Sequence, residues 1–413
     1  MNNLNVWNKW DKLKTVMLGD NYRAEFFDPI KTVKVRDSLK RIADETQEDL
    51  DGYERVLKDF GCEVIRPNMD HSKTIMDHTD INGTVNGKQG IPRSPLQVRD
   101  GQFVAGNHLY FAPGDKGIWE DLAEQYKDNH TMLAWLTEDE NHQMEYRTWT
   151  KEQFEQPNIW CSNTLDYGTY EQYKEDPNYF RALNAKEAKI LKGFHAWNGS
   201  SADGPSWTIV GKDLYVDAFD IAIRQSQRHA IEKHTPNTRI NELHHGGHSD
   251  GCFHTIKPGA ILSLEEIQTY EHTFPGWDVC YLPDQSFDSV QGFLKLKNQV
   301  GGKWWVPGEE ENDALTNFVE TWLTDWVGYV EETVFDVNVL VLDEHHVCVS
   351  QENNEQVNAF LKKHKMEPVY VPWRHRYFWD GGLHCITLDL EREGTQQDYF
   401  PERSASITDQ GFE

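Results

Sequence analysis

A cysteine with two glycines close before it is the first feature of this sequence that could do chemistry. The segment GGLHCITLDLEREG (381–394) places Cys385 directly after His384, and a run with strand character follows. Glycines before a thiol let the backbone bend and leave the sulfur accessible, and a thiolate is the only strong side-chain nucleophile available near neutral pH. Cys385 is therefore a candidate nucleophile. On this segment alone, a buried free cysteine that acts as a small hydrophobic residue is an equally good interpretation.

A second segment, HHGGHSDGCFHTIKPGAILS (244–263), carries four histidines and an aspartate among Gly-rich turns. His248 and Asp250 are two positions apart, so on an extended backbone both side chains project to the same face. This spacing predicts an acid/base group and a carboxylate at one site. The histidines at 244, 245, 248 and 254 also invite a metal interpretation, since imidazoles are common zinc ligands. Only the 244/248 pair has helical spacing and the two intervening glycines disfavour a helix, so we expect acid/base chemistry and no metal.

A third segment, SPLQVRDGQFVAGNHLYFAP (94–113), places Arg99 and Asp100 at the entry to a predicted hairpin. An aspartate at such a position is by itself an ordinary turn residue. Nothing in this segment alone demands a function.

The elements that must position these residues are short strands and amphipathic helices that alternate along the whole chain. Three segments have the form strand, two-residue polar turn, strand, which predicts β-hairpins: AGNHLYF (105–111), VGKDLYV (210–216) and LDEHHVCV (342–349). The spacing of apolar residues predicts a helix over 37–60 that stops at Gly61 and leads into a strand, CEVIRP (62–67). A second helix-to-strand pattern runs from Glu355 to PVYVP (368–372).

These repeated hairpin-plus-helix units have no Pro/Gly/Ser-rich linker between them. They favour an internally repeated α/β architecture in a single catalytic domain over residues 1–413. The stretch 284–330 differs, because it combines a turn-rich segment with an amphipathic one, and it predicts an inserted helical element or a lid. Its tryptophans are most simply core and docking residues. They are Trp304, Trp305, Trp322 and Trp326.

The charge and the cysteine pattern exclude several classes of protein. The 413-residue chain has 68 Asp and Glu against 41 Lys and Arg, a formal charge of −27, which repels nucleic-acid phosphates and anionic lipid and favours small cations as partners. A solvated acidic surface explains the same charge. The six cysteines include no CxxC pair, the start lacks a signal-peptide pattern, and no apolar run reaches the roughly 20 residues that span a bilayer. We therefore expect a cytoplasmic protein without nucleic-acid or membrane partners.

Taken together, the three reactive segments and two further ones resemble the amidinotransferase family, in particular the glycine amidinotransferases, nearly from end to end. The further segments are VWNKWDKLKTVMLGD (6–20) and VNVLVLDEHHVCVS (337–350). The Cys385 segment and the HxD pattern followed after seven residues by Pro-Gly are the specific ones. The resemblance implies a five-bladed pseudo-symmetric α/β propeller of ββαβ units around a central polar channel, with neither a metal nor an organic cofactor.

The resemblance also implies roles for residues at matching positions. Cys385 becomes the nucleophile, and His248 becomes the general acid/base. Asp100 and Asp250 become the carboxylates that bind a guanidinium group. Two carboxylates suit that task, because a guanidinium offers five N–H donors in a planar fork.

Two places depart from the family pattern. The aspartate that orients the family's histidine aligns with Ser206, and Asp203 matches the first aspartate of the same run. Either residue is a candidate for orienting His248, and an ordinary turn containing Asp203 is the alternative. The arginine that grips the substrate's α-carboxylate falls at Ile267, and its helper serine falls near Glu332.

An aliphatic and an acidic residue at these last positions favour a substrate whose far end is neutral or cationic, such as an agmatine-like amine. A substitute arginine from the loop before the nucleophile, Arg374 or Arg376, is the alternative. The expected function is transfer of an amidino group from a small guanidino donor, arginine or agmatine-like, to an amine acceptor through a covalent amidino-cysteine in a ping-pong cycle. The alternatives are a guanidino hydrolase or deiminase and a non-catalytic guanidino-binding protein. A homodimer is compatible with the sequence.

Overall fold

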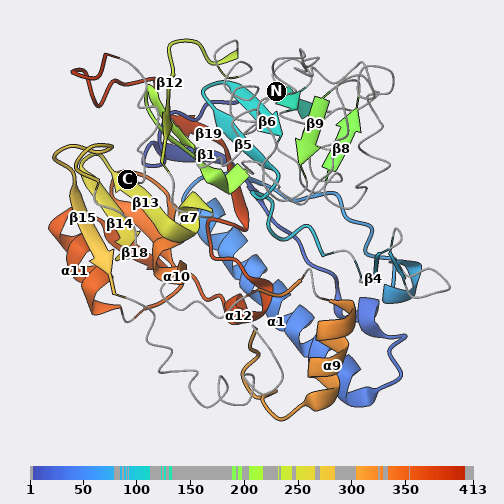
Figure 1. Ribbon diagram of the computed structural model, residues 1–413. Coiled ribbons are helices and arrows are strands. Elements are labelled where there is room, and N and C mark those ends of the chain that lie inside the picture. The colour runs from blue at the N-terminus through green and yellow to red at the C-terminus, as the bar shows by residue number, and fades with distance from the viewer. Residues whose placement is uncertain are drawn as a thin grey trace.

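Both helices and strands occur along the described part of the chain (Figure 1). The computed structural model describes residues 3–78, 93–111, 204–216, 234–243, 248–265, 270–283, 304–323, 334–352 and 354–404, together with short stretches between 84 and 132, between 188 and 197, at 231 and at 326–328. The mixed α/β class that the sequence predicts is confirmed.

Five three-stranded sheets dominate the described residues, and all share one plan. In each sheet two strands pair antiparallel, and a third runs parallel to the middle one. The sheets are β19 (Thr387–Glu393), β1 (Lys12–Leu18) and β2 (Glu63–Ile65); β5 (Gln102–Ala105), β6 (His108–Phe111) and β7 (His130–Met132); β10 (Trp207–Val210), β11 (Asp213–Val216) and β12 (Arg239–Glu242); β13 (Phe253–Lys257), β14 (Ala260–Leu264) and β15 (Asp278–Leu282); β16 (Leu340–Val341), β17 (His346–Val349) and β18 (Glu367–Tyr370). Two further antiparallel pairs are β3 (Thr84–Val85) with β4 (Lys88–Gln89) and β8 (Ala188–Leu191) with β9 (Phe194–Trp197).

The three hairpins predicted from turn residues are confirmed as antiparallel pairs: β5 with β6, β10 with β11, and β16 with β17. The predicted two-residue turn is found only in the first two, because residues 342–345 separate the strands of the third. The third strand of each sheet is parallel to the second, so a crossover connection must join them. In the first sheet this connection contains α1 (Val33–Asp59), and in the sheet of β17 and β18 it contains α11 (Glu355–Lys363).

The helix α1 is the one that the apolar spacing predicts over 37–60, although it begins earlier, at Val33. Its buried face includes residues three, four and seven positions apart: Leu39, Ile42, Leu50, Tyr53 and Leu57. Gly61 follows the helix with φ of +85°, a conformation that glycine adopts without strain. The helix therefore ends where the sequence predicts.

The remaining described helices are short, apart from α9. They are η1 (Ala24–Phe27), η2 (Ile75–His78), η3 (Gly204–Ser206), α7 (Ser249–Cys252), α9 (Asp313–Trp322), α10 (Val334–Val337) and α12 (Arg376–Trp379). Within the predicted insert, α9 is helical, and Trp304 and Trp326 are buried as predicted. Residues 284–303 lie outside the described residues, so the extent of the insert stays a prediction.

One sheet joins the two ends of the chain. The strands β1 and β19 pair antiparallel from Lys12 opposite Glu393 to Leu18 opposite Thr387, as Figure 1 shows. Cys385 lies in the turn before β19, two positions ahead of its first residue. The strand pairing therefore fixes the position of the candidate nucleophile relative to the N-terminal segment.

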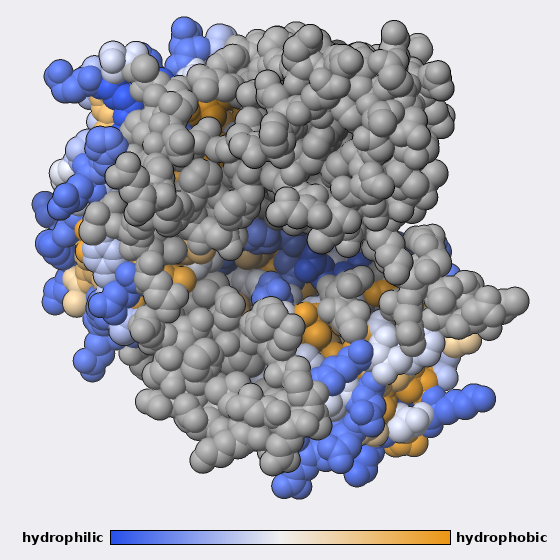
Figure 2. All heavy atoms as spheres, viewed as in Figure 1, coloured by the Kyte–Doolittle hydropathy of each residue, from blue (hydrophilic) through white to orange (hydrophobic). Residues whose placement is uncertain are grey.

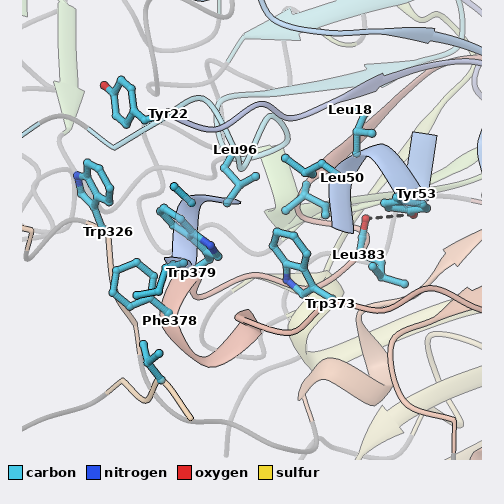
Figure 3. Packing of buried hydrophobic residues seen from close by; sticks show 14 of the residues in the cluster. Leu18, Tyr22, Leu50, Tyr53, Leu96, Trp326, Trp373, Phe378, Trp379 and Leu383 are labelled. Atoms are coloured by element: carbon cyan, nitrogen blue, oxygen red, sulfur yellow. Dashed lines mark hydrogen bonds between the residues drawn. The ribbon is translucent and has the colours of Figure 1, made fainter. Parts of the chain in front are cut away.

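The loop before Cys385 is anchored on α1 by large buried side chains (Figure 3). The side chains of this cluster that come from the loop, α12 and α1 include Trp373, Phe378, Trp379, Leu50 and Tyr53. The hydroxyl of Tyr53 donates to the backbone oxygen of Leu383 at 3.4 Å, and Nε1 of Trp379 donates to Oγ1 of Thr46 at 2.8 Å. Burial and these two bonds hold the loop in one position.

The exposed described residues are mainly hydrophilic on the face in Figure 2, where they line its left margin. Of the helices that the structure describes, none combines the length and the apolar character that crossing a membrane requires. This agrees with the absence of a long apolar run in the sequence.

Candidate active site

Cys385 lies between α12 and β19, and 7% of its surface is exposed. Its backbone N–H donates to Oδ1 of Asn338 at 3.1 Å, and Nδ2 of the same asparagine donates to Sγ at 3.0 Å. A donor aimed at sulfur stabilises a thiolate. The surroundings of Cys385 therefore suit a nucleophile better than a cysteine that only fills space.

Asn338 connects the segments that carry the predicted site residues. It directly follows α10, and its Nδ2 also donates to the backbone oxygen of Asp250 at 3.1 Å. Its Oδ1 accepts the backbone N–H of His384 at 2.9 Å. A Cβ on Gly382 would lie 2.5 Å from this Oδ1. The glycine is needed because the backbone must approach the Asn338 side chain so closely.

His248 and Asp250 lie at the start of a helical turn, not on an extended strand. The turn is α7, where the N–H of Gly251 donates to the oxygen of His248 at 3.1 Å, and β13 begins only at Phe253. The backbone of His248 itself is extended, but Asp250 lies in the helical turn, so the extended spacing assumed for the pair does not hold. Both side chains nevertheless interact with Cys385.

The carboxylate of Asp250 is buried, and only one of its two oxygens has hydrogen-bond partners among the described residues. Its Oδ2 accepts from Nδ1 of His384 at 2.6 Å and from Sγ of Cys385 at 3.5 Å. Its Oδ1 has no hydrogen-bond partner among the described residues. Burial raises the pKa of Asp250, and the charges of His248 and Arg99 oppose that rise. A buried carboxylate oxygen without a partner is costly, so it is a natural place for a cationic ligand.

Asp100 lies in a more exposed place, with 25% of its side-chain surface accessible. Its Oδ2 accepts from Nη2 of Arg93 at 2.6 Å. Burial is the main cause that raises the pKa of Asp250 and of Cys385, and the negative charge of Asp100 adds to it in both cases. Asp100 therefore belongs to the same site. An ion pair this exposed contributes about 0–1 kcal/mol. A cationic ligand can therefore displace Arg93 from Asp100.

Ser206 ends η3, which packs against α7, and it is buried. At the start of η3, the N–H of Gly204 donates to the backbone oxygen of Asp100 at 3.0 Å. The turn with Ser206 thus connects the segments of two predicted site residues. The residues Asp203, Glu332 and Ile267 lie outside the described residues, so their roles stay predictions.

The surroundings hold the thiol of Cys385 in its protonated form. Burial raises the pKa of Cys385 to about 12, and the charges of Asp250 and Asp100 add to this effect. A hydrogen bond with His248 and the charge of that ring act in the opposite direction. At neutral pH Cys385 of the unliganded protein is therefore a thiol, and positive charge nearby would lower its pKa.

A buried ion network lies behind the site. Asp389 accepts from Nη2 of Arg99 at 2.9 Å and from Nε of Arg392 at 2.7 Å. Burial alone would raise the pKa of Asp389, but the two arginines outweigh it and lower that pKa to about 2. Nε of Arg99 also donates to the backbone oxygen of His384 at 3.0 Å. Arg99 therefore ties the segment of Asp100 to the segment of the nucleophile.

His254 is fully buried, and its ring nitrogens have no hydrogen-bond partner in the described part of the chain. Burial holds the pKa of His254 well below its usual value, so the ring is neutral. The described residues contain no group of three or more His, Cys, Asp or Glu side chains that could hold a metal. His244 and His245, which belong to the predicted histidine cluster, lie outside the described residues.

The sequence assigns no role to Asn338 or His384. In the structure, Asn338 contacts both Cys385 and Asp250, and His384 contacts Asp250. The available signals are weak. Asn338 stands at the start of a strand-rich motif, and His384 stands beside Cys385. Neither position indicates which distant group the side chain binds.

The two arginines before the nucleophile differ in their contacts. Arg374 donates from Nε to Oδ1 of Asp49 at 2.8 Å, so its guanidinium is bound to α1. Arg376 lies with its guanidinium 4.8 Å from the ring centroid of Tyr377 and donates from Nη1 to the backbone oxygen of Trp373. Its Nε has no partner among the described residues. Of these two, Arg374 is held by acidic residues of α1, whereas Arg376 forms no ion pair with a carboxylate among the described residues.

In parts of its sequence and in its fold, the chain is similar to one class of enzymes, the amidinotransferases. A stretch of 204 residues is 23% identical to the L-arginine:L-lysine amidinotransferase of Pseudomonas savastanoi pv. phaseolicola and covers 48% of this chain and 46% of that protein. A stretch of 154 residues is 39% identical to the mitochondrial glycine amidinotransferase of Xenopus laevis and covers 37% and 28%. The chain thus spans less than half the length of these curated relatives. No family model matches the chain.

The likeness in fold extends over nearly the whole chain. A solved amidinotransferase of Microseira wollei, from the saxitoxin biosynthetic pathway, matches with a TM-score of 0.56 at 18% identity, over 96% of this chain and 99% of that one. At this identity the likeness concerns the fold alone. The resemblance to amidinotransferases that the sequence motifs indicate is confirmed.

Proposed function

We propose that this chain transfers an amidino group from a guanidino donor to an amine acceptor through a covalent intermediate on Cys385. The observation that carries the proposal is the carboxylate of Asp250. It is buried and accepts from the thiol of Cys385, and its Oδ1 is left without a partner among the described residues. A guanidinium bound there has its carbon close to the nucleophile.

The cationic guanidinium of the donor first binds the two negatively charged aspartates of the site. The planar guanidinium donates to Oδ1 of Asp250 and to Asp100, which exchanges Arg93 for the ligand. The negative charges of these aspartates raise the pKa of the Cys385 thiol, so a cation that neutralises them lowers it again. The ligand thereby helps to create the thiolate that attacks it.

The chemical steps then follow from general acid/base and covalent catalysis. The Cys385 thiol gives its proton to His248, with which it forms a hydrogen bond, and the resulting thiolate attacks the guanidino carbon and forms a C–S bond. His248 protonates the departing amine as the C–N bond breaks, which leaves an amidino group on sulfur. The acceptor amine gives its proton to His248, attacks the same carbon, and releases the thiolate. Water in place of the amine would give a ureido product.

The architecture belongs to the same proposal. The five three-stranded sheets of the described residues would be the blades of a closed five-bladed propeller, with the Cys385, Asp250 and Asp100 segments meeting at its centre. The common plan of the sheets supports this arrangement, because each has the strand order that a ββαβ unit requires.

The test follows the guanidino carbon. The protein is incubated with arginine or agmatine labelled with ¹³C at that carbon, with and without glycine or lysine as acceptor, and products are identified by mass spectrometry. We expect the label in a new guanidino compound only when an acceptor is present. A labelled ureido product would indicate a hydrolase. An unchanged donor under all conditions would contradict both activities.

A control variant ties any activity to the site. Cys385→Ala removes the nucleophile, and Cys252→Ala removes a half-buried cysteine outside the hydrogen-bond contacts of Cys385 described above. We expect the first variant to be inactive and the second to keep its activity. Equal activity of both would overturn the role of Cys385.

A further inference from the structure

We infer that His384 is a positioning residue for Asp250: its Nδ1–H holds Oδ2, so that Oδ1 is presented to the guanidinium of the donor. This inference rests on the proposed function. It concerns a residue that contacts neither the donor nor the acceptor in the proposed mechanism.

The contact is short and buried. Nδ1 of His384 lies 2.6 Å from Oδ2 of Asp250, and the two side chains are 3% and 1% exposed. An N–H···O bond of this length indicates a charge-assisted bond, which is stronger than a neutral one. Of the two groups that donate to Oδ2, His384 is much closer than the Cys385 sulfur, which lies 3.5 Å away.

The backbone of His384 is fixed from both sides, so the ring cannot follow the carboxylate if the carboxylate rotates. The N–H of His384 donates to Oδ1 of Asn338 at 2.9 Å, and its carbonyl oxygen accepts from Nε of Arg99 at 3.0 Å. The ring also meets the ring of His254 edge to face, with centroids 4.7 Å apart at 88°. His384 is thus a rigid donor to Oδ2 of Asp250, whose Oδ1 has no partner among the described residues.

The protonation state agrees with a donor at Nδ1. Burial holds the pKa of His384 well below its usual value, and the charges of Arg99 and Lys9 act in the same direction, so the ring is neutral. A neutral imidazole carries one proton, and the carboxylate of Asp250 requires it on Nδ1. Nε2 is then without a proton, and no described residue bonds to it.

This geometry has a consequence for binding. With Oδ2 occupied, the carboxylate plane is fixed and Oδ1 remains as a preformed acceptor. Without the donor on His384, the carboxylate can rotate and accept the Cys385 thiol with either oxygen. The guanidinium then has to displace that thiol contact, so donor binding weakens even though every group in the proposed chemistry is still present.

Two substitutions separate this role from simple filling of space. His384→Asn places an amide N–H close to the position of Nδ1, whereas His384→Gln keeps more of the ring's volume and places its amide near Nε2. For positioning, we expect His384→Asn to stay within about tenfold of the original kcat/KM and His384→Gln to lose about a hundredfold, mainly through KM. If the ring only fills space, glutamine is tolerated at least as well as asparagine, and that result would overturn the inference.

A double variant checks that the effect passes through Asp250. In an Asp250→Asn background, His384→Gln should lower kcat/KM by less than about threefold further, because residues that act as a unit are not additive. A full additional loss would mean that His384 acts elsewhere. Activity of the unsubstituted protein is measured first, so its absence identifies failure of the proposed function and not of this inference.

If the variants do not fold, a spectroscopic measurement on the unsubstituted protein tests the same inference. In the unsubstituted protein labelled with ¹⁵N-histidine, the ring nitrogens of His384 report the tautomer. We expect a neutral ring with its proton on Nδ1. A proton on Nε2 would exclude the donation to Asp250 and overturn the inference.

Discussion

Asn338 donates its side-chain N–H to Sγ of Cys385 at 3.0 Å, and the carbonyl oxygen of the same amide accepts the backbone N–H of Cys385 at 3.1 Å. One side chain therefore fixes both the nucleophilic atom and the peptide that carries it. The amide is neutral, so it stabilises negative charge on sulfur without adding a second charge to a site that already contains Asp250.

The first prediction concerns this contact. Asn338→Asp keeps an acceptor for the N–H groups of His384 and Cys385, but it replaces the donor to sulfur by an anion. Loss of a hydrogen bond to a charged group costs about 1.5–3 kcal/mol, and like-charge repulsion adds to it, so kcat should fall by at least about tenfold. Thermal unfolding is the control, and we expect a cooperative transition at a lower Tm, because Asn338 is 1% exposed and a buried charge is costly. Unchanged kcat would show that the donor does not act on the thiolate.

A second prediction is that the amidino group resides on Cys385 during turnover. Acid quenching of the enzyme with donor and no acceptor should give a protein whose mass is increased by one amidino group, and peptide mapping should place it on this residue. Cys385→Ala should give no adduct under the same conditions. An adduct on another cysteine, such as Cys252, would contradict the assignment of the nucleophile.

The third prediction is a pH dependence. The pKa of Cys385 is raised to about 12, chiefly by burial, and the reactive thiolate exists only above the pKa. In the unliganded protein the rate of alkylation by iodoacetamide should therefore rise about tenfold per pH unit from pH 7 to 10 without levelling off. Free cysteine, with a pKa of about 8.5, should level off in this range. A plateau for Cys385 near pH 7 would mean that the free thiol is already ionised.

A fourth prediction compares the two carboxylates. Asp250 is 1% exposed, so removal of its charge leaves a guanidinium without a partner in a buried place, at a cost of about 3–5 kcal/mol. Asp250→Asn should lose at least about a hundredfold in kcat/KM. Asp100 is 25% exposed, and solvent can replace part of its contribution, so Asp100→Asn should lose less. The reverse order would show that the guanidinium binds mainly at Asp100.

The last prediction concerns the donor. The resemblance predicts that Ile267 and Glu332 stand at positions that would otherwise bind an α-carboxylate, and Arg374 is paired with Asp49. We therefore expect agmatine to be used at least as well as arginine, and Arg376→Leu to leave their ratio unchanged. The ratio of kcat/KM values decides it. If arginine is preferred by more than about tenfold, which is 1.4 kcal/mol, and Arg376→Leu removes the preference, Arg376 binds the carboxylate and this prediction is wrong.

Local patterns in the sequence predict the elements of the fold well. Apolar residues at helical spacing indicate α1, and Gly61 marks its end, because helix formation and termination depend on neighbours within a few positions. The hairpins follow from turn residues for the same reason. The turn of α7 is the exception, because a helix of four residues is too short to show a helical period in the sequence.

The sequence by itself determined which residue types are available for chemistry and where they stand in the chain: a cysteine after two glycines, a histidine two positions before an aspartate, and an aspartate at a hairpin entry. Only the tertiary structure decided what they contact. Asn338 and Cys385 are 47 positions apart, and Asp250 and His384 are 134 apart. Such pairs form only when separate sheets pack together, and burial of the packed site then sets the pKa of Cys385, which no local pattern contains.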